Sequence, residues 1–142
     1  MADETTRADE FLHGILTGDT ALTTALTGGI FADLAPEKTQ FPYGLHHFQG
    51  GADVRGNGPG RIMVSGLWLV QAVAEQDSYL GTLRTAADRI DTLLQAKSGA
   101  AGSDGVVFSC VREQPYRMVE VLTGGAQVRH LGGLYRLLVQ VP

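Results

Sequence analysis

The segment Gly50–Arg61, "GGADVRGNGPGR", contains five glycines, one proline and two arginines. A phosphate-binding loop would run directly into a helix whose first backbone amides bind the anion. The residues that follow, Arg61–Gln76, are instead rich in branched and aromatic side chains and carry no helix start signal. Pro42–Gln49, on the other side, also has the composition of a strand. We therefore predict a long β-hairpin with the glycines at its tip.

The second strand of this predicted hairpin is longer than a compact domain can accommodate. Fully extended, Arg61–Glu75 would span about 50 Å, whereas a compact domain of this length is about 35 to 40 Å across. Either the strand bends at a bulge around Gly66, or the hairpin projects from the body of the protein.

Apolar side chains at helical spacing predict three helices. The first is amphipathic and stops at Gly18, and a short second helix has Asp19 as its N-cap and Gly28 or Gly29 at its end. The third and most regular helix begins at Asp77 or Ser78 and stops at Lys97 and Gly99. Their apolar positions are Ala8, Phe11, Leu12, Ile15 and Leu16, then Ala21, Leu22, Ala25 and Leu26, then Leu80, Leu83, Ala87, Ile90 and Leu94.

The rest of the chain predicts strands and connections. Residues 30–41 are interpreted as a surface connection, residues 98–105 as a flexible connector, and residues 106–113, 116–122 and 133–141 as strands separated by Gln-Pro and glycine turns. In the last strand Tyr135, Leu137, Val139 and Val141 share one face. The fold class is therefore α+β in a single domain, residues 1–142: a mostly antiparallel sheet packed against one long helix, with short N-terminal helices and a long projecting β-hairpin.

Composition limits the classes of partner. The net charge is only -4 and there is no basic run, so direct nucleic-acid recognition is not expected. Charged residues make up only 18% of the chain and there are 19 glycines, which hints that partners cover some of the surface. No apolar run approaches the length of a membrane span, and the N-terminal segment lacks the features of a signal peptide. We expect no membrane contact and synthesis in the cytoplasm.

The histidines do not predict a metal site. His46 and His47 are adjacent in a predicted strand, so their side chains leave opposite faces and cannot chelate one ion together. His13 and His130 have no cysteine or carboxylate at ligand spacing. No metal and no cofactor is expected.

Catalytic residues are also not indicated. Ser65 and Ser109 lie within predicted strands, not in the strand-to-helix elbow of a serine nucleophile. Cys110 is the single cysteine and lies in the apolar run "VVFSCV", which is typical of a buried structural thiol. Asp88 and Asp91, with arginines nearby, are interpreted as the solvated face of a helix. We expect a protein that is not an enzyme.

Arginines are the remaining conspicuous residues, and arginine is enriched at protein interfaces. Arg112, Arg117, Arg129 and Arg136 are predicted to share the polar outer face of the sheet. The candidate protein-interface residues are Arg55, Asn57, Arg61, Arg129 and Arg136.

The order of motifs along the chain resembles the tail terminator, or tail completion, proteins of long-tailed bacteriophages. The resemblance covers about Ile15 to Val141 and depends on the order and spacing of packing patterns. The matching segments are "GDTALTTALTGGIF" (18–31), "LAPEKTQFPYGLHHF" (34–48), "AADRIDTLL" (86–94), "REQPYRMVEV" (112–121) and "HLGGLYRLLVQV" (130–141).

This resemblance implies a structural virion protein that forms a ring, typically a hexamer. Such a ring caps the head-proximal end of the tail tube, ends its polymerisation and offers a joining surface to the neck. The expected partners are further copies of the chain, the tail tube protein and a neck or connector protein, in the virion and, during assembly, in the host cytoplasm. The hairpin segment 50–60 would be a mobile extension that becomes ordered on assembly. The alternatives are a head-tail connector or neck adaptor, or a small nucleotide-binding module that uses Gly50–Arg61.

Overall fold

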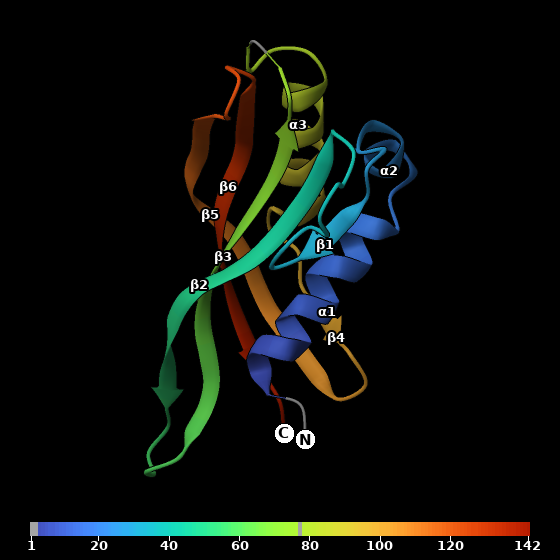
Figure 1. Ribbon diagram of the computed structural model, residues 1–142. Coiled ribbons are helices and arrows are strands. Elements are labelled where there is room, and N and C mark those ends of the chain that lie inside the picture. Colours follow the sequence, from blue (N-terminus) through green and yellow to red (C-terminus); the bar gives the residue numbers. More distant parts are fainter. Residues whose placement is uncertain (1–2, 77) are drawn as a thin grey trace.

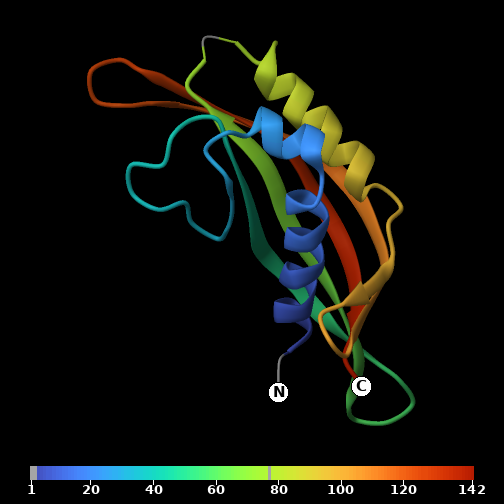
Figure 2. The same ribbon diagram turned by 90° about the vertical axis from the view of Figure 1, so that its right-hand side faces the viewer.

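The computed structural model describes residues 3–76 and 78–142. It contains a curled six-stranded sheet in the order β1-β2-β3-β6-β5-β4, with the helices on one face (Figures 1 and 2). Only β1 and β2 pair in parallel, and the other four neighbouring pairs are antiparallel. The elements are α1 (Glu4–Thr17), α2 (Thr20–Ala25), β1 (Ile30–Ala32), β2 (Tyr43–Arg55), β3 (Arg61–Ala74), α3 (Thr82–Leu94), β4 (Gly99–Ala101), β5 (Gly105–Val121) and β6 (Gln127–Gln140).

The mixed α/β fold with a mostly antiparallel sheet agrees with the prediction, but the prediction of one long helix does not. Helices α1 and α3 have 14 and 13 residues and both pack on the sheet. α3 is shorter than predicted because it begins only at Thr82, after Gly81 at a φ of 85°. Ser78 accepts a hydrogen bond from the Leu80 amide and does not cap the helix, while Asp77 lies outside the described residues.

The ends of the other helices are partly as predicted. The Asp3 carboxylate accepts a hydrogen bond from the Thr6 amide at the start of α1, and Gly18 ends that helix. Asp19 is the N-cap of α2, as predicted. However, α2 ends at Ala25 with Leu26 as its C-cap, before the glycines at 28 and 29, and α3 ends before Lys97. The chain after α3 is instead held by the sheet, since the Ala96 amide donates to the Cys110 carbonyl at 2.8 Å.

Three strand assignments were wrong. Three-residue strands β1 and β4 occupy parts of the segments predicted as a surface connection and a flexible connector. Strands this short have no sequence pattern of their own and are defined by the neighbour that they pair with. β5 is also one strand, not two, and passes through Gln114 and Pro115 without a turn. A register shift between Arg112 and Gln114 and a position at the sheet edge accommodate the proline.

The long hairpin is present, but its first strand reaches further than predicted. β2 and β3 pair as far as Arg55 and Arg61, so the connecting loop is only residues 56–60. The bend lies in β2 and not at Gly66, because the register shifts between Phe48 and Gly50, where Gly50 has a φ of 139°. The end of the hairpin projects beyond the sheet (Figure 1), since β6 pairs with β3 only from Val64 onward.

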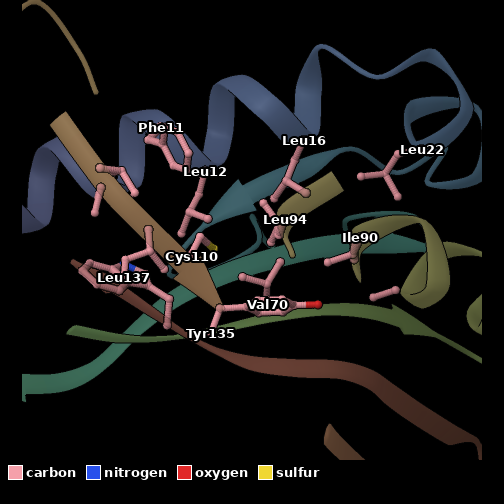
Figure 3. Close-up of a cluster of buried hydrophobic side chains, with 14 of the residues drawn as sticks. Phe11, Leu12, Leu16, Leu22, Val70, Ile90, Leu94, Cys110, Tyr135 and Leu137 are labelled. Atoms are coloured by element: carbon pink, nitrogen blue, oxygen red, sulfur yellow. The ribbon is translucent and has the colours of Figure 1, made fainter. Parts of the chain in front are cut away.

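The core lies between the helices and one face of the sheet (Figure 3). Tyr135, Leu137 and Val139 are almost completely buried, which confirms three of the four predicted inward positions of the last strand, whereas Val141 follows the end of β6 and is only partly buried. Trp68 is fully buried and packs on Phe48 at 4.9 Å between ring centroids. The helices contribute Ala8, Phe11, Leu12, Leu16, Leu22, Leu83, Ala86, Ile90 and Leu94 to this core.

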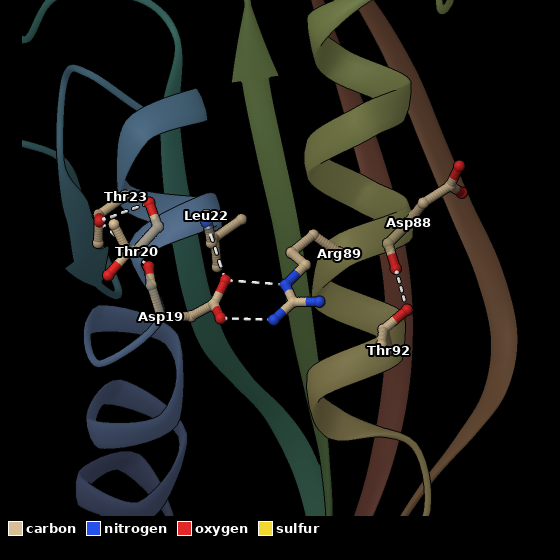
Figure 4. Close-up of polar contacts among 7 residues, drawn as sticks. All are labelled: Asp19, Thr20, Leu22, Thr23, Asp88, Arg89 and Thr92. Carbon is tan, nitrogen blue, oxygen red and sulfur yellow. Dashed lines mark hydrogen bonds and ion pairs between the residues drawn. The ribbon is translucent and has the colours of Figure 1, made fainter.

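An ion pair joins α3 to the start of α2 (Figure 4). Arg89 donates from Nε to one oxygen of Asp19 at 2.8 Å and from Nη2 to the other at 2.6 Å. This bidentate pair lowers the pKa of Asp19 from its usual 3.8 to about 2. Asp91 accepts a hydrogen bond from the Tyr135 hydroxyl at 2.9 Å. The interpretation of these helix charges as a solvated face was therefore wrong for Arg89 and Asp91, because their partners lie on other elements.

We predict that Asp19→Asn removes part of the acid sensitivity of the fold. Because the folded pKa of Asp19 is lowered, its stabilisation is present above pH 3.8 and is lost as the pH falls toward 2. Asparagine keeps the N-cap hydrogen-bond acceptor but not the charge. The urea midpoint of the variant, measured between pH 5 and pH 2, should therefore fall less steeply than that of the wild type. Asp88→Asn, which removes an exposed carboxylate from α3, is the matched control. If the urea midpoint of Asp19→Asn fell with pH as steeply as that of the wild type, the prediction would be contradicted.

Candidate assembly surfaces

The three predicted interface residues near the tip of the long hairpin have two different environments. Arg55 and Asn57 are exposed at the end of β2 and in the loop. Arg61, at the start of β3, instead makes a bidentate ion pair with Glu4 of α1, with N–O distances of 2.9 and 3.0 Å. Glu4 is only 6% exposed, and the hydrogen bonds from Arg61 hold the pKa of that carboxyl below its usual value. Arg61, although its side chain is 48% exposed, therefore fixes the hairpin to α1, and Arg55 and Asn57 are exposed closer to the tip.

Arg129 and Arg136 lie far from the tip and on opposite faces of β6. They are seven residues apart in one uninterrupted strand, so their side chains alternate to different sides of the sheet. Arg136 lies on the face without helices and makes a bidentate ion pair with Glu113, with a closest distance of 2.9 Å. Arg129 lies on the helix side and donates to the Gln76 carbonyl at 3.1 Å. The five predicted interface residues thus do not form one site.

The prediction that four arginines share the outer face was wrong for three of them. Arg112 is aligned with the buried Tyr135, and Arg117 with Leu131, which packs on the core; both arginines are therefore on the helix side. The register shift after Arg112 puts it on the same side as Arg117, although a regular strand would separate them. Arg117 and Arg129 both contact the ring of Tyr79, at 5.1 and 4.9 Å from its centroid. This cluster has no signal in the sequence, because Tyr79 lies in a loop that is distant along the chain.

Apolar side chains remain exposed along β5 and the turn after it. Phe108 is 48% exposed and Val121 is 69% exposed, both unusual for large apolar residues in a strand. A signal is present in the sequence, because apolar residues occupy both alternating faces of this strand. The exposed apolar residues of this region are Val106, Phe108, Val111, Met118, Val119, Val121 and Leu122.

Two edges of the sheet are open over long segments. β1 covers β2 only at Gly44–His46, so residues 47–55 have no strand beside them in the part of the chain that the structure describes. β4 covers β5 only at Gly105–Val107, and the chain after α3 adds one bond to the Cys110 carbonyl and one to the Arg112 amide. Residues 113–121 therefore form a second open edge. We refer to these segments as the β2 edge and the β5 edge.

Two histidines that the sequence analysis treated separately meet beneath α1. His13 Nδ1 lies 3.1 Å from Nε2 of the buried His46, and burial is the main cause of the lowered pKa of His13. Asp9 lies 3.4 Å from the other ring nitrogen of His46 and accepts a hydrogen bond from Trp68 Nε1 at 3.1 Å. His47 is exposed, so the adjacent histidines do leave opposite faces. Across residues 3–76 and 78–142, no group of three or more histidine, cysteine or carboxylate side chains is arranged to hold a metal ion.

Cys110 is fully buried, as expected for a structural thiol. Burial raises the pKa of its thiol to about 12, so the thiolate needed for nucleophilic attack does not form at neutral pH. None of the helices within the described residues is both long and apolar enough to cross a membrane.

Comparison with solved structures shows what the fold is similar to. A protein chain of the virion of a native gene transfer agent particle superposes with a TM-score of 0.71, at 14% sequence identity and over 91% of each chain. A second solved structure covers 100% of this chain and 97% of its own, with a TM-score of 0.52 and 13% identity. No protein-family model and no curated protein matches the sequence. At these identities the likeness establishes a shared fold.

We predict that Arg61→Ala lowers the urea midpoint of unfolding, whereas Arg55→Ala leaves it unchanged. Truncating Arg61 leaves the Glu4 carboxylate, which is 6% exposed, without its bidentate partner. Arg55 is exposed at the end of the same hairpin and serves as the matched control. Equal midpoints for the two variants, measured by circular dichroism at pH 7, would show that the ion pair does not fasten the hairpin.

Proposed function

We propose that this protein is a structural component of a phage-like virion that forms a ring at the head-proximal end of the tail tube. The ring would end tube polymerisation and join the tail to the neck. The observation that carries the proposal is the likeness of the whole fold to a chain of a gene transfer agent virion, at a TM-score of 0.71 over 91% of both chains.

The positions of the tail-terminator-like motifs in the fold support the same proposal. The segment 18–31 contains α2 and leads into β1, and the segment 86–94 belongs to α3, which packs on α2 and the sheet. The segments 112–121 and 130–141 are neighbouring parts of β5 and β6. Motifs that are dispersed in the sequence thus belong to one packed unit, as a resemblance that spans the domain requires.

The surfaces also favour a protein that functions in an assembly. Exposed apolar side chains along β5, together with two open sheet edges, are features that soluble monomers usually cover or interrupt. We assign Arg55, Asn57 and Arg136 to contacts with neighbouring proteins, since Arg55 and Asn57 are exposed near the hairpin tip and Arg136, with a side chain 35% exposed, lies on the face without helices. Arg61 and Arg129 would act less directly, by holding the hairpin and the Tyr79 loop in place.

A structural role fits these features better than a catalytic or nucleotide-binding role. The single thiol is buried and protonated. The loop of residues 56–60 joins two strands, so no helix N-terminus is available there to bind a phosphate.

The experiment is deletion of the gene in the phage or gene transfer agent that encodes it, followed by electron microscopy. We expect tails of uncontrolled, excessive length, because nothing would end tube polymerisation. Restoring the wild-type gene should restore a single tail length. Normal-length tails detached from heads would instead indicate a neck adaptor, and normal particles would contradict both roles. Negative-stain images of the purified wild-type protein should show rings.

A further inference from the structure

We propose that the two open edges pair with each other in adjacent copies, so that the β5 edge of one copy forms an antiparallel ladder with the β2 edge of the next. The inference builds on the ring of the proposed function and names its subunit contact. It rests on four observations: the two open edges, the direction of their strands, the faces of their side chains, and two charges that have no ion-pair partner among the described residues.

Both edges are only partly protected against pairing with another strand. A monomeric protein usually protects an edge with charges, prolines, bulges or a covering segment. The β5 edge carries Pro115 near one end and the charged residues Glu113, Arg117 and Glu120, yet Met118, Val119 and Val121 are 38 to 69% exposed. The β2 edge continues as paired strand to Arg55 with no further strand on its open side in the described chain, and the start of α1 lies over its helix-side face, where Glu4 and Asp53 line one pocket. Each edge thus presents unpaired backbone groups to the outside.

The strand directions make these two edges compatible in a ring. β2, β3, β6 and β5 are neighbours in this order and each pair is antiparallel, so β2 and β5 run in opposite directions. Copies related by rotation about one axis keep the sense of their strands along that axis, even where the strands are tilted against it. The β5 edge of one copy therefore meets the β2 edge of the next in antiparallel orientation, through a head-to-tail contact that can close into a ring.

The charges of two side chains, and the face of the sheet on which they lie, favour a register in which Arg117 is opposite Asp53. Asp53 is aligned with the buried Val64, and Arg117 with Leu131, so both side chains lie on the helix side of the sheet. Within residues 3–76 and 78–142 neither charge has an ion-pair partner. Directly opposite charges stabilise a ladder, whereas like charges destabilise it.

The same register also matches the other face. Met118 comes opposite Ala52 and Tyr116 opposite Val54, which joins apolar side chains on the face without helices. Pro115 falls at the end of the ladder, opposite Arg55, where the loss of one backbone donor interrupts no continuing bonds. Register errors by one residue would exchange these faces, so this arrangement is specific.

The pairing also requires a stagger between copies. Within one copy, Asp53 is level with Val107 across β3 and β6, whereas in the contact it is level with Arg117 of the next copy. Each copy is therefore shifted along the strand direction relative to its neighbour. Strands in a closed sheet must tilt against the ring axis to accommodate such a shift.

The first experiment exchanges the two charges. Asp53→Arg and Arg117→Asp should each raise the dissociation constant of subunit association by about tenfold or more, because each places like charges opposite one another. The double variant should restore assembly toward the wild-type level. Native mass spectrometry and sedimentation measure assembly, and thermal unfolding establishes that each variant is folded. Asp88→Arg, a charge reversal on exposed α3 away from both edges, should assemble normally.

The second experiment tests the register with a disulfide. In Ala52→Cys/Met118→Cys the two new thiols should cross-link adjacent copies, because opposite Cα atoms in a ladder lie about 4.5 to 5.5 Å apart and a disulfide spans that distance. Oxidation should give a ladder of covalent oligomers. β3 and β6 separate the two positions within one copy, so the link cannot be intramolecular. The control is Ala52→Cys/Tyr116→Cys. These two positions lie on the same face but are offset by two residues in the proposed register, so they should link weakly.

The outcomes separate this contact from the proposed function. Rings that form without the cross-link and without rescue in the charge exchange would overturn the edge pairing and leave the tail-end ring intact. A wild-type protein that remains monomeric at its highest soluble concentration, with no cross-link in the double-cysteine variant, would also overturn it. Rescue and cross-linking in a protein whose deletion leaves tail length normal would support the contact and overturn the proposed function.

Discussion

Two buried aromatic side chains of the sheet, Trp68 and Tyr135, are the anchors on which the rest of the structure depends. Each ring lies in the apolar core, and each has one polar atom that burial would leave without water. Trp68 Nε1 donates to Asp9 of α1 at 3.1 Å, and the Tyr135 hydroxyl donates to Asp91 of α3 at 2.9 Å. Because a buried donor without an acceptor is costly, these bonds fix both helices over the same face of the sheet.

Placing both long helices on one face has a consequence for the remaining surface. The opposite face carries no helix in the described chain, and the short strands β1 and β4 cover only a few residues of each edge. The offset between strands also lets two hairpins extend beyond the body at opposite ends (Figure 2). The buried core that stabilises the fold therefore lies on one side of the sheet. The other face and the edges remain available for partners.

Local chemistry explains which elements could be predicted. Asp19 as an N-cap, Gly18 as a helix stop and the inward row from Tyr135 to Val139 each depend on residues close in sequence, and all are found in the structure. The failures involve distant partners. β4 exists because β5 pairs with it, and the chain continues straight through Pro115 because it lies at an edge where a missing amide breaks no ladder.

The features of the candidate surfaces also divide into those set by local sequence and those set by distant partners. The sequence by itself determined an α+β fold, a glycine-rich hairpin between two strands and most inward positions of the helices, since hydrophobic period and turn chemistry are local properties. Leu80, predicted on the inward face of the third helix, is instead 63% exposed because α3 begins only at Thr82. Only the tertiary structure decided that Arg61 is held by Glu4, that Arg117 and Arg129 flank Tyr79, and which edges stay open. Those features depend on strand register and bulges, because a shift of one residue moves a side chain to the other face of the sheet.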